Sequence, residues 1–321
     1  MIKKLLTLLL GALATSVLFA DNHPVERIFI STDREVYIAG DVVFCSLFCL
    51  DSQALPSNSS AVSYLELVST EGTVTEAKIG LLEGRGAGSF RIPVSIPTGV
   101  YRLVAYTSGN VGEDGAPWIA GSRLLTIFNT LSVSRVKDGV YILDEAAYQS
   151  LKSFSPENAG QLIISSPARS QELSEYTIFM ENDGTAADFS LSVYHEDDIV
   201  PVKQENSMAG FLASLPSVST QDYTSKRQID YDGEIIYARI SGKKTEDTGN
   251  AVATLSSAGA PSNMYIGVTE GEMVRFLTNN IYGDREIVCE VSDMDLETGS
   301  ISIESPFIGV SSSIKLMTTD A

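Results

Sequence analysis

Short apolar runs alternate with turn residues from Ile28 to Phe128. Runs of this length, bounded by Gly, Pro, Asn and Asp at close spacing, are typical of antiparallel β-sandwiches. The turn groups include residues 39–41 and 97–99, where proline presets φ or glycine accepts the positive φ of a tight turn. The pattern predicts strands at 28–32, 36–38, 42–50, 64–68, 74–82, 89–94, 100–107 and 124–128.

Two segments of this region carry further information. Residues 42–50 are apolar at odd and even positions, which predicts a central strand buried on both faces. The glycine-rich run 84–88 precedes a predicted strand rather than a helix, so we interpret it as a hairpin loop and not as a dinucleotide-binding loop.

The rest of the chain also favours strands. One helix is predicted at 144–154, with Asp144 as its N-cap. Strands follow at 162–165, 176–181 and 189–195, and the Ser- and Thr-rich stretch 214–228 is interpreted as a linker or mobile loop. A third β unit begins at Tyr231, so the predicted fold is all-β, with tandem antiparallel β-sandwich domains.

A resemblance to a known domain lies in the first β region. The run TDREVYIAGDVVF at 32–44 is followed, in order, by YLEL at 64–67, GSFRIP at 88–93 and PTGVYRL at 97–103. Residues 26–130 therefore resemble a macroglobulin-type domain, which is an immunoglobulin-like β-sandwich. Macroglobulins that trap proteases use a Cys-Gly-Glu-Gln thioester, which this sequence lacks, so the resemblance does not imply covalent trapping.

A second resemblance lies near the C-terminus. Residues 234–242, EIIYARISG, are similar to the first strand of a carboxypeptidase-regulatory-like, transthyretin-type domain, and 251–255 stand where its second strand lies. The region 231–310 departs from that pattern at Ala238, where the family has glycine, and at 272–275, which lengthen a hairpin. Together the two resemblances imply the N-terminal part of a large bacterial envelope protein, of which we expect this chain to be a shortened member or a fragment.

The N-terminus has the pattern of a secretion signal. Lys3 and Lys4 precede an apolar run that ends at Ala20, where cleavage is predicted. That run is too short for a spanning helix, although a membrane anchor is the alternative interpretation. The predicted segments are a signal peptide at 1–20, a macroglobulin-like sandwich at 21–130, a connector with a second β unit and linker at 131–230, and the regulatory-like sandwich at 231–321. The mature chain is expected in the periplasm or at the cell surface, associated with the outer membrane, with no further transmembrane span.

The charge balance argues against nucleic acid as a partner. The full chain has 22 Lys and Arg and 41 Asp and Glu, and removal of Lys3 and Lys4 leaves 20 − 41 = −21. Nucleic-acid binders need clustered basic residues, whereas the basic residues here are dispersed. Solubility explains so acidic a surface, and an attraction for cations or basic partners is the functional alternative.

Few residues could support catalysis. The chain has only two histidines, His23 and His195, and none of the common hydrolase or nucleotide-binding motifs. Cys45 and Cys49 are four residues apart in one strand, about 13 Å, which is too far for a disulfide, so we predict two core thiols. The sequence therefore predicts a non-catalytic protein without a cofactor.

Two candidate ligand sites are weakly marked. Trp118 lies in a Gly-rich loop near Glu113 and Asp114, where it either plugs the end of the sandwich or stacks on a ligand such as a sugar. Cleavage after Ala20 would expose Asp21, Asn22 and His23, whose nitrogens can form a square-planar set for copper or nickel.

Calcium is the other metal considered. The acidic runs 196–198 and 293–297 could supply oxygen ligands, but solvated loop acids are the simpler explanation, and Thr298 stands where an EF-hand loop requires glycine. The function predicted from all these features is an exported envelope module that binds another envelope protein or a polymer. The alternative is a carbohydrate-binding or carbohydrate-degrading surface protein with Trp118 and its acids in a groove.

Overall fold

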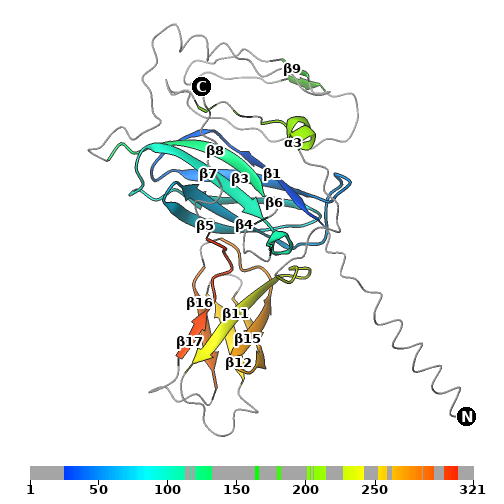
Figure 1. Ribbon diagram of the computed structural model, residues 1–321, viewed down its shortest axis with the longest axis vertical. Coiled ribbons are helices and arrows are strands. Elements are labelled where there is room, and N and C mark those ends of the chain that lie inside the picture. Colours follow the sequence, from blue (N-terminus) through cyan, green and yellow to red (C-terminus); the bar gives the residue numbers. More distant parts are fainter. Residues whose placement is uncertain are drawn as a thin grey trace, which may run out of the picture.

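The chain forms two β-sandwiches, one above the other in Figure 1. The computed structural model describes residues 25–112, 117, 120–131, 201–202, 204, 206–214, 227–241, 252–258, 262–283, 285–292 and 300–309, and the backbone alone at 163–165 and 179–181. Nearly all paired strands are antiparallel, and each sandwich encloses its own apolar core. The predicted all-β fold is confirmed.

The first sandwich packs a three-stranded sheet, in the order β1-β3-β6, against a five-stranded sheet in the order β2-β8-β7-β4-β5. Its core includes Ile28, Leu47, Leu65, Leu103 and Leu125, which alternate along the strands with outward-facing residues. The strands are β1 (Arg27–Thr32), β2 (Val36–Ile38), β3 (Val42–Leu50), β4 (Val62–Ser69), β5 (Gly72–Gly80), β6 (Arg85–Arg91), β7 (Gly99–Tyr106) and β8 (Gly121–Phe128). Only β2 pairs in parallel, with β8.

The second sandwich has sheets in the orders β14-β15-β11-β17 and β13-β12-β16. Ala238, Leu255, Val274 and Phe276 are fully buried between them. The strands are β11 (Glu234–Ser241), β12 (Ala253–Ser257), β13 (Asn263–Ile266), β14 (Val268–Glu270), β15 (Met273–Thr278), β16 (Ile287–Val291) and β17 (Ser300–Ile303).

The remaining elements are short. A 3-10 turn, η1 (Ser108–Asn110), follows β7, and β9 (Ile163–Ser165) pairs with β10 (Phe179–Glu181) inside the strands predicted there. The helix α3 (Met208–Ser214) was not predicted, because seven residues are too few to show a helical period. The helix predicted at 144–154 and the strand at 189–195 lie outside the described residues.

The strand buried on both faces is β4, not β3. The prediction of a central strand is confirmed for β3, which lies between β1 and β6, but burial of both its faces is wrong, because the outward-facing Phe44 is 59% exposed. In β4 every residue from Val62 to Val68 is buried, including Ser63 and Glu66. The reason is tertiary, since the second sandwich covers the outer face of β4 while the first sandwich's core covers the inner face (Figure 1).

The glycine-rich run is also not the hairpin loop that was predicted. Only Gly84, with φ of 72°, lies in the turn, whereas Gly86 and Gly88 lie inside β6. A Cβ atom on Gly86 would come within 2.8 Å of the Gly80 carbonyl oxygen, and one on Gly88 within 2.9 Å of the Ile79 side chain. These glycines therefore let β6 cross closely over β5.

Candidate functional site

The residues predicted to bind ligands lie outside the described part of the chain. This applies to Trp118, Glu113 and Asp114, to Asp21, Asn22 and His23, and to the acidic runs 196–198 and 293–297. Among the residues that the structure does describe, no group of three or more His, Cys, Asp or Glu could hold a metal ion. The sugar and metal sites therefore stay predictions.

Side chains of the run 32–44 form a hydrogen-bonded polar cluster between β1 and β2. Asp33 Oδ1 accepts hydrogen bonds from the Tyr37 hydroxyl at 2.6 Å and from the Phe44 N–H at 3.0 Å. Arg34 pairs with Asp33 at 3.3 Å and with Asp41 at 3.2 Å, and its guanidinium lies 4.8 Å from the centre of the Tyr37 ring. Burial, and then Asp33, raises the pKa of Tyr37. The cluster thus fixes the path by which the chain passes from the three-stranded sheet at β1 to the five-stranded sheet at β2, which is a structural role.

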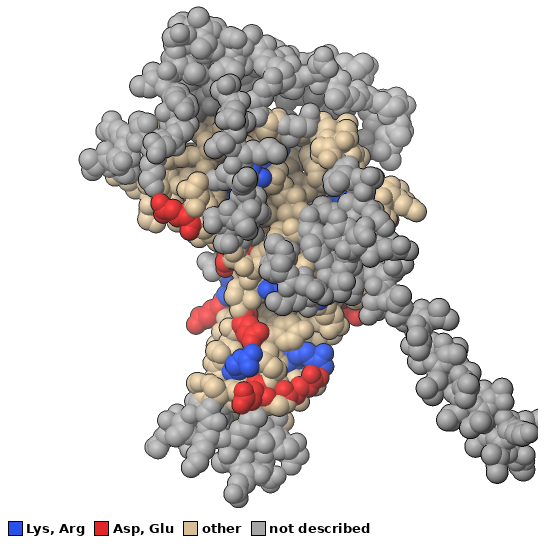
Figure 2. All heavy atoms as spheres, in the orientation of Figure 1, with Lys and Arg blue, Asp and Glu red and all other residues tan. Residues whose placement is uncertain are grey.

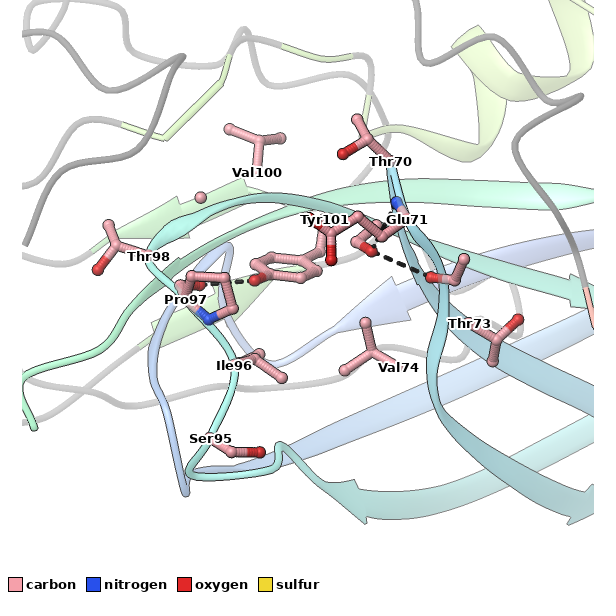
Figure 3. A pocket seen from close by; sticks show the side chains of 13 residues that line it. Thr70, Glu71, Thr73, Val74, Ser95, Ile96, Pro97, Thr98, Val100 and Tyr101 are labelled. Carbon is pink, nitrogen blue, oxygen red and sulfur yellow. Dashed lines mark hydrogen bonds between the residues drawn. The ribbon is translucent and has the colours of Figure 1, made fainter. Parts of the chain in front are cut away.

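An open hollow of about 440 Å³ lies at one end of the first sandwich, between residues 69–74 and 95–101 (Figure 3). The Tyr101 ring lies in its floor, and the hydroxyl donates to the Pro97 carbonyl at 2.6 Å. Burial, with a smaller effect of Glu71, raises the pKa of Tyr101 to about 12. The phenol is therefore neutral at pH 7, and its proton is engaged in the turn.

The other hydroxyls of this hollow also serve local turns. Ser69 Oγ donates to the Gly72 carbonyl and accepts from the Glu71 N–H, both at 3.1 Å. Thr98 Oγ1 accepts from the Asn129 N–H at 2.9 Å. These hydrogen bonds shape the loop ends and leave no arranged nucleophile and base among the residues that line the hollow.

A buried polar site lies at the joint between the two sandwiches. Its apolar part places Tyr282, Phe307 and Ile308 of the second sandwich against the outer face of β4 and β7. The rings of Tyr64 and Tyr106 stack at 5.7 Å, and Phe307 meets Tyr64 edge-on at 5.8 Å. Aromatic pairs of this geometry add about 0.5–1.5 kcal/mol each to the burial of their surface.

Asp230 enters the joint from the segment that leads into β11. Its carboxylate accepts hydrogen bonds from the Tyr64 hydroxyl at 2.9 Å and from the Ile235 N–H at 3.1 Å. Its backbone carbonyl accepts from the Ala61 N–H at 2.7 Å. Burial raises the pKa of Asp230, and the hydrogen bonds to its carboxylate oppose that rise. One residue thus ties the start of the second sandwich to the start of β4.

Glu234, the first residue of β11, forms the second polar link. Its Oε2 lies 2.7 Å from Lys78 Nζ, and the residue is only 1% exposed. The other oxygen, Oε1, is buried and has no hydrogen-bond partner among the described residues. Burial raises the pKa of Glu234 although Lys78 opposes the rise. The pair therefore places an ionisable group in the dry interior of the joint.

Glu66 of β4 completes the polar set. Its carboxylate accepts the Tyr106 hydroxyl and the Thr73 hydroxyl, both at 2.6 Å, and the Ile308 N–H at 3.2 Å. Tyr64, Glu66 and Glu234 lie in the runs that carry the two resemblances, but no pattern in the sequence predicted that they would meet in a joint. Glu66 offered one signal, because an acid stands between the apolar Tyr64 and Val68 on the outward face of one strand.

Charges of both signs are interspersed on the face drawn in Figure 2, with red and blue spheres side by side over the second sandwich. The described ion pairs of the second sandwich include Arg239 with Glu304 at 3.1 Å and Arg275 with Glu270 at 2.6 Å. Exposed pairs of this kind contribute about 0–1 kcal/mol to stability. This part of the surface is mixed in charge.

Comparisons with known proteins do not identify a family. No protein-family model and no curated protein sequence match the chain. A structural likeness to the CARDB domain of a Pyrococcus furiosus protein, in complex with di-metal ions, has 11% identity and a TM-score of 0.22, and covers 32% of this chain and 93% of that one. A likeness to Salmonella alpha-2-macroglobulin reacted with methylamine has 11% identity and a TM-score of 0.27, and covers 88% of this chain and 14% of that one. A likeness to Cwp6 from Clostridium difficile has 15% identity and a TM-score of 0.21, and covers 48% of this chain and 20% of that one.

The described helices add one observation about membranes. None of them is both long enough and apolar enough to cross a bilayer.

Proposed function

We propose that this protein is a non-catalytic, exported interaction module of the cell envelope, which binds another envelope protein or a surface polymer through two sandwiches held at a fixed orientation. The joint is the observation that supports this proposal. It combines the Lys78–Glu234 ion pair with the hydrogen bond between Tyr64 and Asp230, and the Tyr282 and Phe307 rings pack beside them.

A flexible tether between the domains would not need such a joint. Interfaces between domains that move freely are small and mostly polar, whereas here β4 is buried along its whole outer face. Gly80 supports the same conclusion, because a Cβ atom there would lie 2.6 Å from the Tyr282 ring. The close fit gives the module a constant shape, so that loops on both sandwiches can contact one partner at the same time.

The proposal also includes a division of the chain into segments and a location in the cell. We assign 1–20 to a signal peptide, 21–130 to a macroglobulin-like sandwich, 131–230 to a connector with a second β unit, and 231–321 to a carboxypeptidase-regulatory-like sandwich. The periplasm or the outer-membrane surface is the proposed location. The carbohydrate function assigned to Trp118 rests on the sequence alone.

The test compares the mature protein with a variant in which the joint is wedged open. Gly80→Phe places a ring where Tyr282 lies, while Gly99→Ala is the control, because its new Cβ would meet the Tyr101 ring at an ordinary 3.7 Å. Each protein is used as bait in an envelope extract, and bound proteins and glycans are quantified. We expect the control to retain the partner and Gly80→Phe to retain at least tenfold less.

Two results would overturn the proposal. One is equal retention by both variants when small-angle scattering shows that the joint of Gly80→Phe has opened. The other is turnover of a peptide, ester or glycan substrate by the purified wild-type protein. Circular dichroism confirms that the sandwiches of each variant are folded.

A further inference from the structure

Among the residues that the structure describes, no strand pairs with part of the β8 edge in the first sandwich. On one side, β7 pairs with β8 from Gly121 to Ile127. On the other side, β2 pairs only with residues 126–128, and its pairing ends where the Thr126 N–H donates to the Glu35 carbonyl at 2.8 Å. Residues 122–125 therefore form an edge that faces away from β7, which we name the β8 edge.

A glutamine side chain takes the place of a strand at this edge. The Leu124 N–H donates to Gln204 Oε1 at 2.8 Å, and Gln204 Nε2 donates to the Leu124 carbonyl at 2.8 Å. A neighbouring strand would satisfy one residue of β8 with the same pair, one donor and one acceptor. The Gln204 amide thus reproduces the hydrogen bonds of a peptide backbone at the one position that it reaches.

The Glu35 carboxylate contacts the same segment. It accepts Gln204 Nε2 at 3.3 Å and the Asn206 amide, and it pairs with Arg123 at 3.2 Å. The Arg123 side chain is only 9% exposed, so this charge pair lies at the base of the edge. Any segment that replaced the present one would meet a carboxylate that favours amide or basic side chains.

Three phenylalanine rings also contact one another near the β8 edge. Phe211 of α3 lies 5.4 Å from Phe29, which in turn lies 6.2 Å from Phe48. No residue of α3 is buried, Gln204 is half-buried and Asn206 is exposed. The described contacts of this segment with the first sandwich are amide hydrogen bonds and an aromatic contact, and an element without buried residues is typically of low local stability.

We propose that the β8 edge is a strand-addition site for an extended peptide segment of a partner protein, and that the chain's own Gln204, Asn206 and Phe211 occupy this site in the unbound protein. The proposal rests on the interaction function proposed above and names its partner class. The matching peptide pairs its backbone with Leu124, places an amide or basic side chain at Glu35 and sets an aromatic residue on Phe29. Strand addition of this kind takes affinity from main-chain hydrogen bonds and specificity from such side-chain positions.

The covering segment lowers the affinity for any incoming peptide, because only the uncovered fraction of molecules can bind it. Removing the two Gln204 hydrogen bonds and the Phe211 contact should raise that fraction, and hence the affinity, by roughly tenfold or more. A variant that lacks both side chains should therefore accept a peptide that the wild type excludes.

The experiment uses as its probe a fluorescent synthetic peptide of alternating Thr and Val, with one Lys spaced to reach Glu35 and one Phe spaced to reach Phe29, because a peptide of residues 201–214 would bind through the Gln204 side chain rather than through its backbone. The probe is titrated into the full mature protein in three forms: wild type, Gln204→Ala/Phe211→Ala, and the same double variant with Leu124→Pro. Proline removes the N–H that points away from β7 and is tolerated on an edge strand. Glu35→Ala in the double variant serves as a second edge change in case Leu124→Pro unfolds. Gln53→Ala, at an exposed turn, is the matched control.

We expect the double variant to bind the peptide at least tenfold more tightly than the wild type or Gln53→Ala. Loss of that gain with Leu124→Pro or Glu35→Ala would support the site. Equal binding by the wild type and the double variant would overturn the proposal, as would binding that neither edge change reduces.

The joint variant separates the two proposals. Gly80 lies in β5, at the opposite edge of the five-stranded sheet from β2 and β8. Adding Gly80→Phe to the double variant should therefore leave the affinity for the peptide within about twofold. The β8 edge can therefore fail this test while the joint-dependent function stands, and the reverse also holds.

Discussion

The ion pair in the joint makes a prediction whose size depends on pH. Lys78→Met keeps the length of the side chain and removes the cation 2.7 Å from the buried Glu234 carboxylate. Loss of one partner of a buried pair costs about 3–5 kcal/mol, because the remaining charge is left without compensation. The Lys78 side chain is 14% exposed, which favours the lower end of this range.

Protonation of Glu234 limits the loss of stability in Lys78→Met. Without Lys78, Glu234 can take up a proton instead of remaining charged, and its ordinary pKa is 4.5. Holding that proton at pH 7 costs about 3.4 kcal/mol, from about 1.36 kcal/mol for each of roughly 2.5 pH units. At pH 5 the same step costs about 0.7 kcal/mol. Lys78→Met should therefore lose about 3 kcal/mol at pH 7 and less than about 1 kcal/mol at pH 5.

The sign of the pH dependence follows from the direction of the Glu234 pKa shift. Burial raises the pKa of Glu234 in the folded protein, and removal of Lys78 raises it further. Stability from proton binding is fully present below pH 4.5 and is lost as the pH rises through the raised folded value. The variant should thus become more stable, relative to the wild type, as the solution is acidified.

Urea unfolding at pH 5, 6 and 7 measures these differences. Glu234→Gln in the Lys78→Met background removes the buried charge and should restore about 2 kcal/mol at pH 7, with little dependence on pH. Glu304→Gln, which removes an exposed pair, is the control. A loss that stays constant from pH 5 to pH 7, or one that Glu234→Gln does not relieve, would refute the account of the joint as a dry site.

Three further predictions concern other parts of the chain. Asp33→Ala removes the acceptor of two hydrogen bonds in the polar cluster before β2 and should lower the free energy of unfolding by about 2 kcal/mol. Urea titration measures this loss, and a loss below about 0.5 kcal/mol would contradict the structural role of Asp33. Burial raises the pKa of Cys45 to about 12 and also raises that of Cys49, so alkylation followed by mass spectrometry should label the half-buried Cys289 first; faster labelling of either core thiol would contradict the packing. Copper titration of the secreted chain should show one site that His23→Ala abolishes, and equal binding by both forms would show that the N-terminal copper site is wrong.

Much of the strand pattern could be predicted because it is local. The predicted limits of β2 and β3 agree with the structure, and Cys45 and Cys49 are core thiols as their shared strand face indicates. The glycines of β6 could not be placed in the same way. Their role comes from the close crossing of β5, and no local pattern distinguishes a glycine needed for such a contact from one needed for a turn.

The candidate sites show the same division. The sequence drew attention to Trp118 and His23, which are rare residue types, but those residues lie outside the described structure. The joint depends instead on ordinary residues, such as Glu66, Lys78 and Glu234, whose chemistry changes only when another domain removes their water. Lys78 and Glu234 are 156 positions apart, and no spacing rule relates them.

The all-β class could be read from the sequence, because alternation of side chains and the φ preferences of Gly and Pro act within a few residues. The excess of negative charge also follows from the sequence, and the signal peptide stays a prediction from it. The folded structure was needed to show that β4 is buried on both faces, that Asp230 and Glu234 are buried in the joint, and that Gln204 covers the β8 edge. Each of these features requires contact between segments far apart in the chain, since burial and desolvation belong to the folded surface and not to any one stretch of sequence.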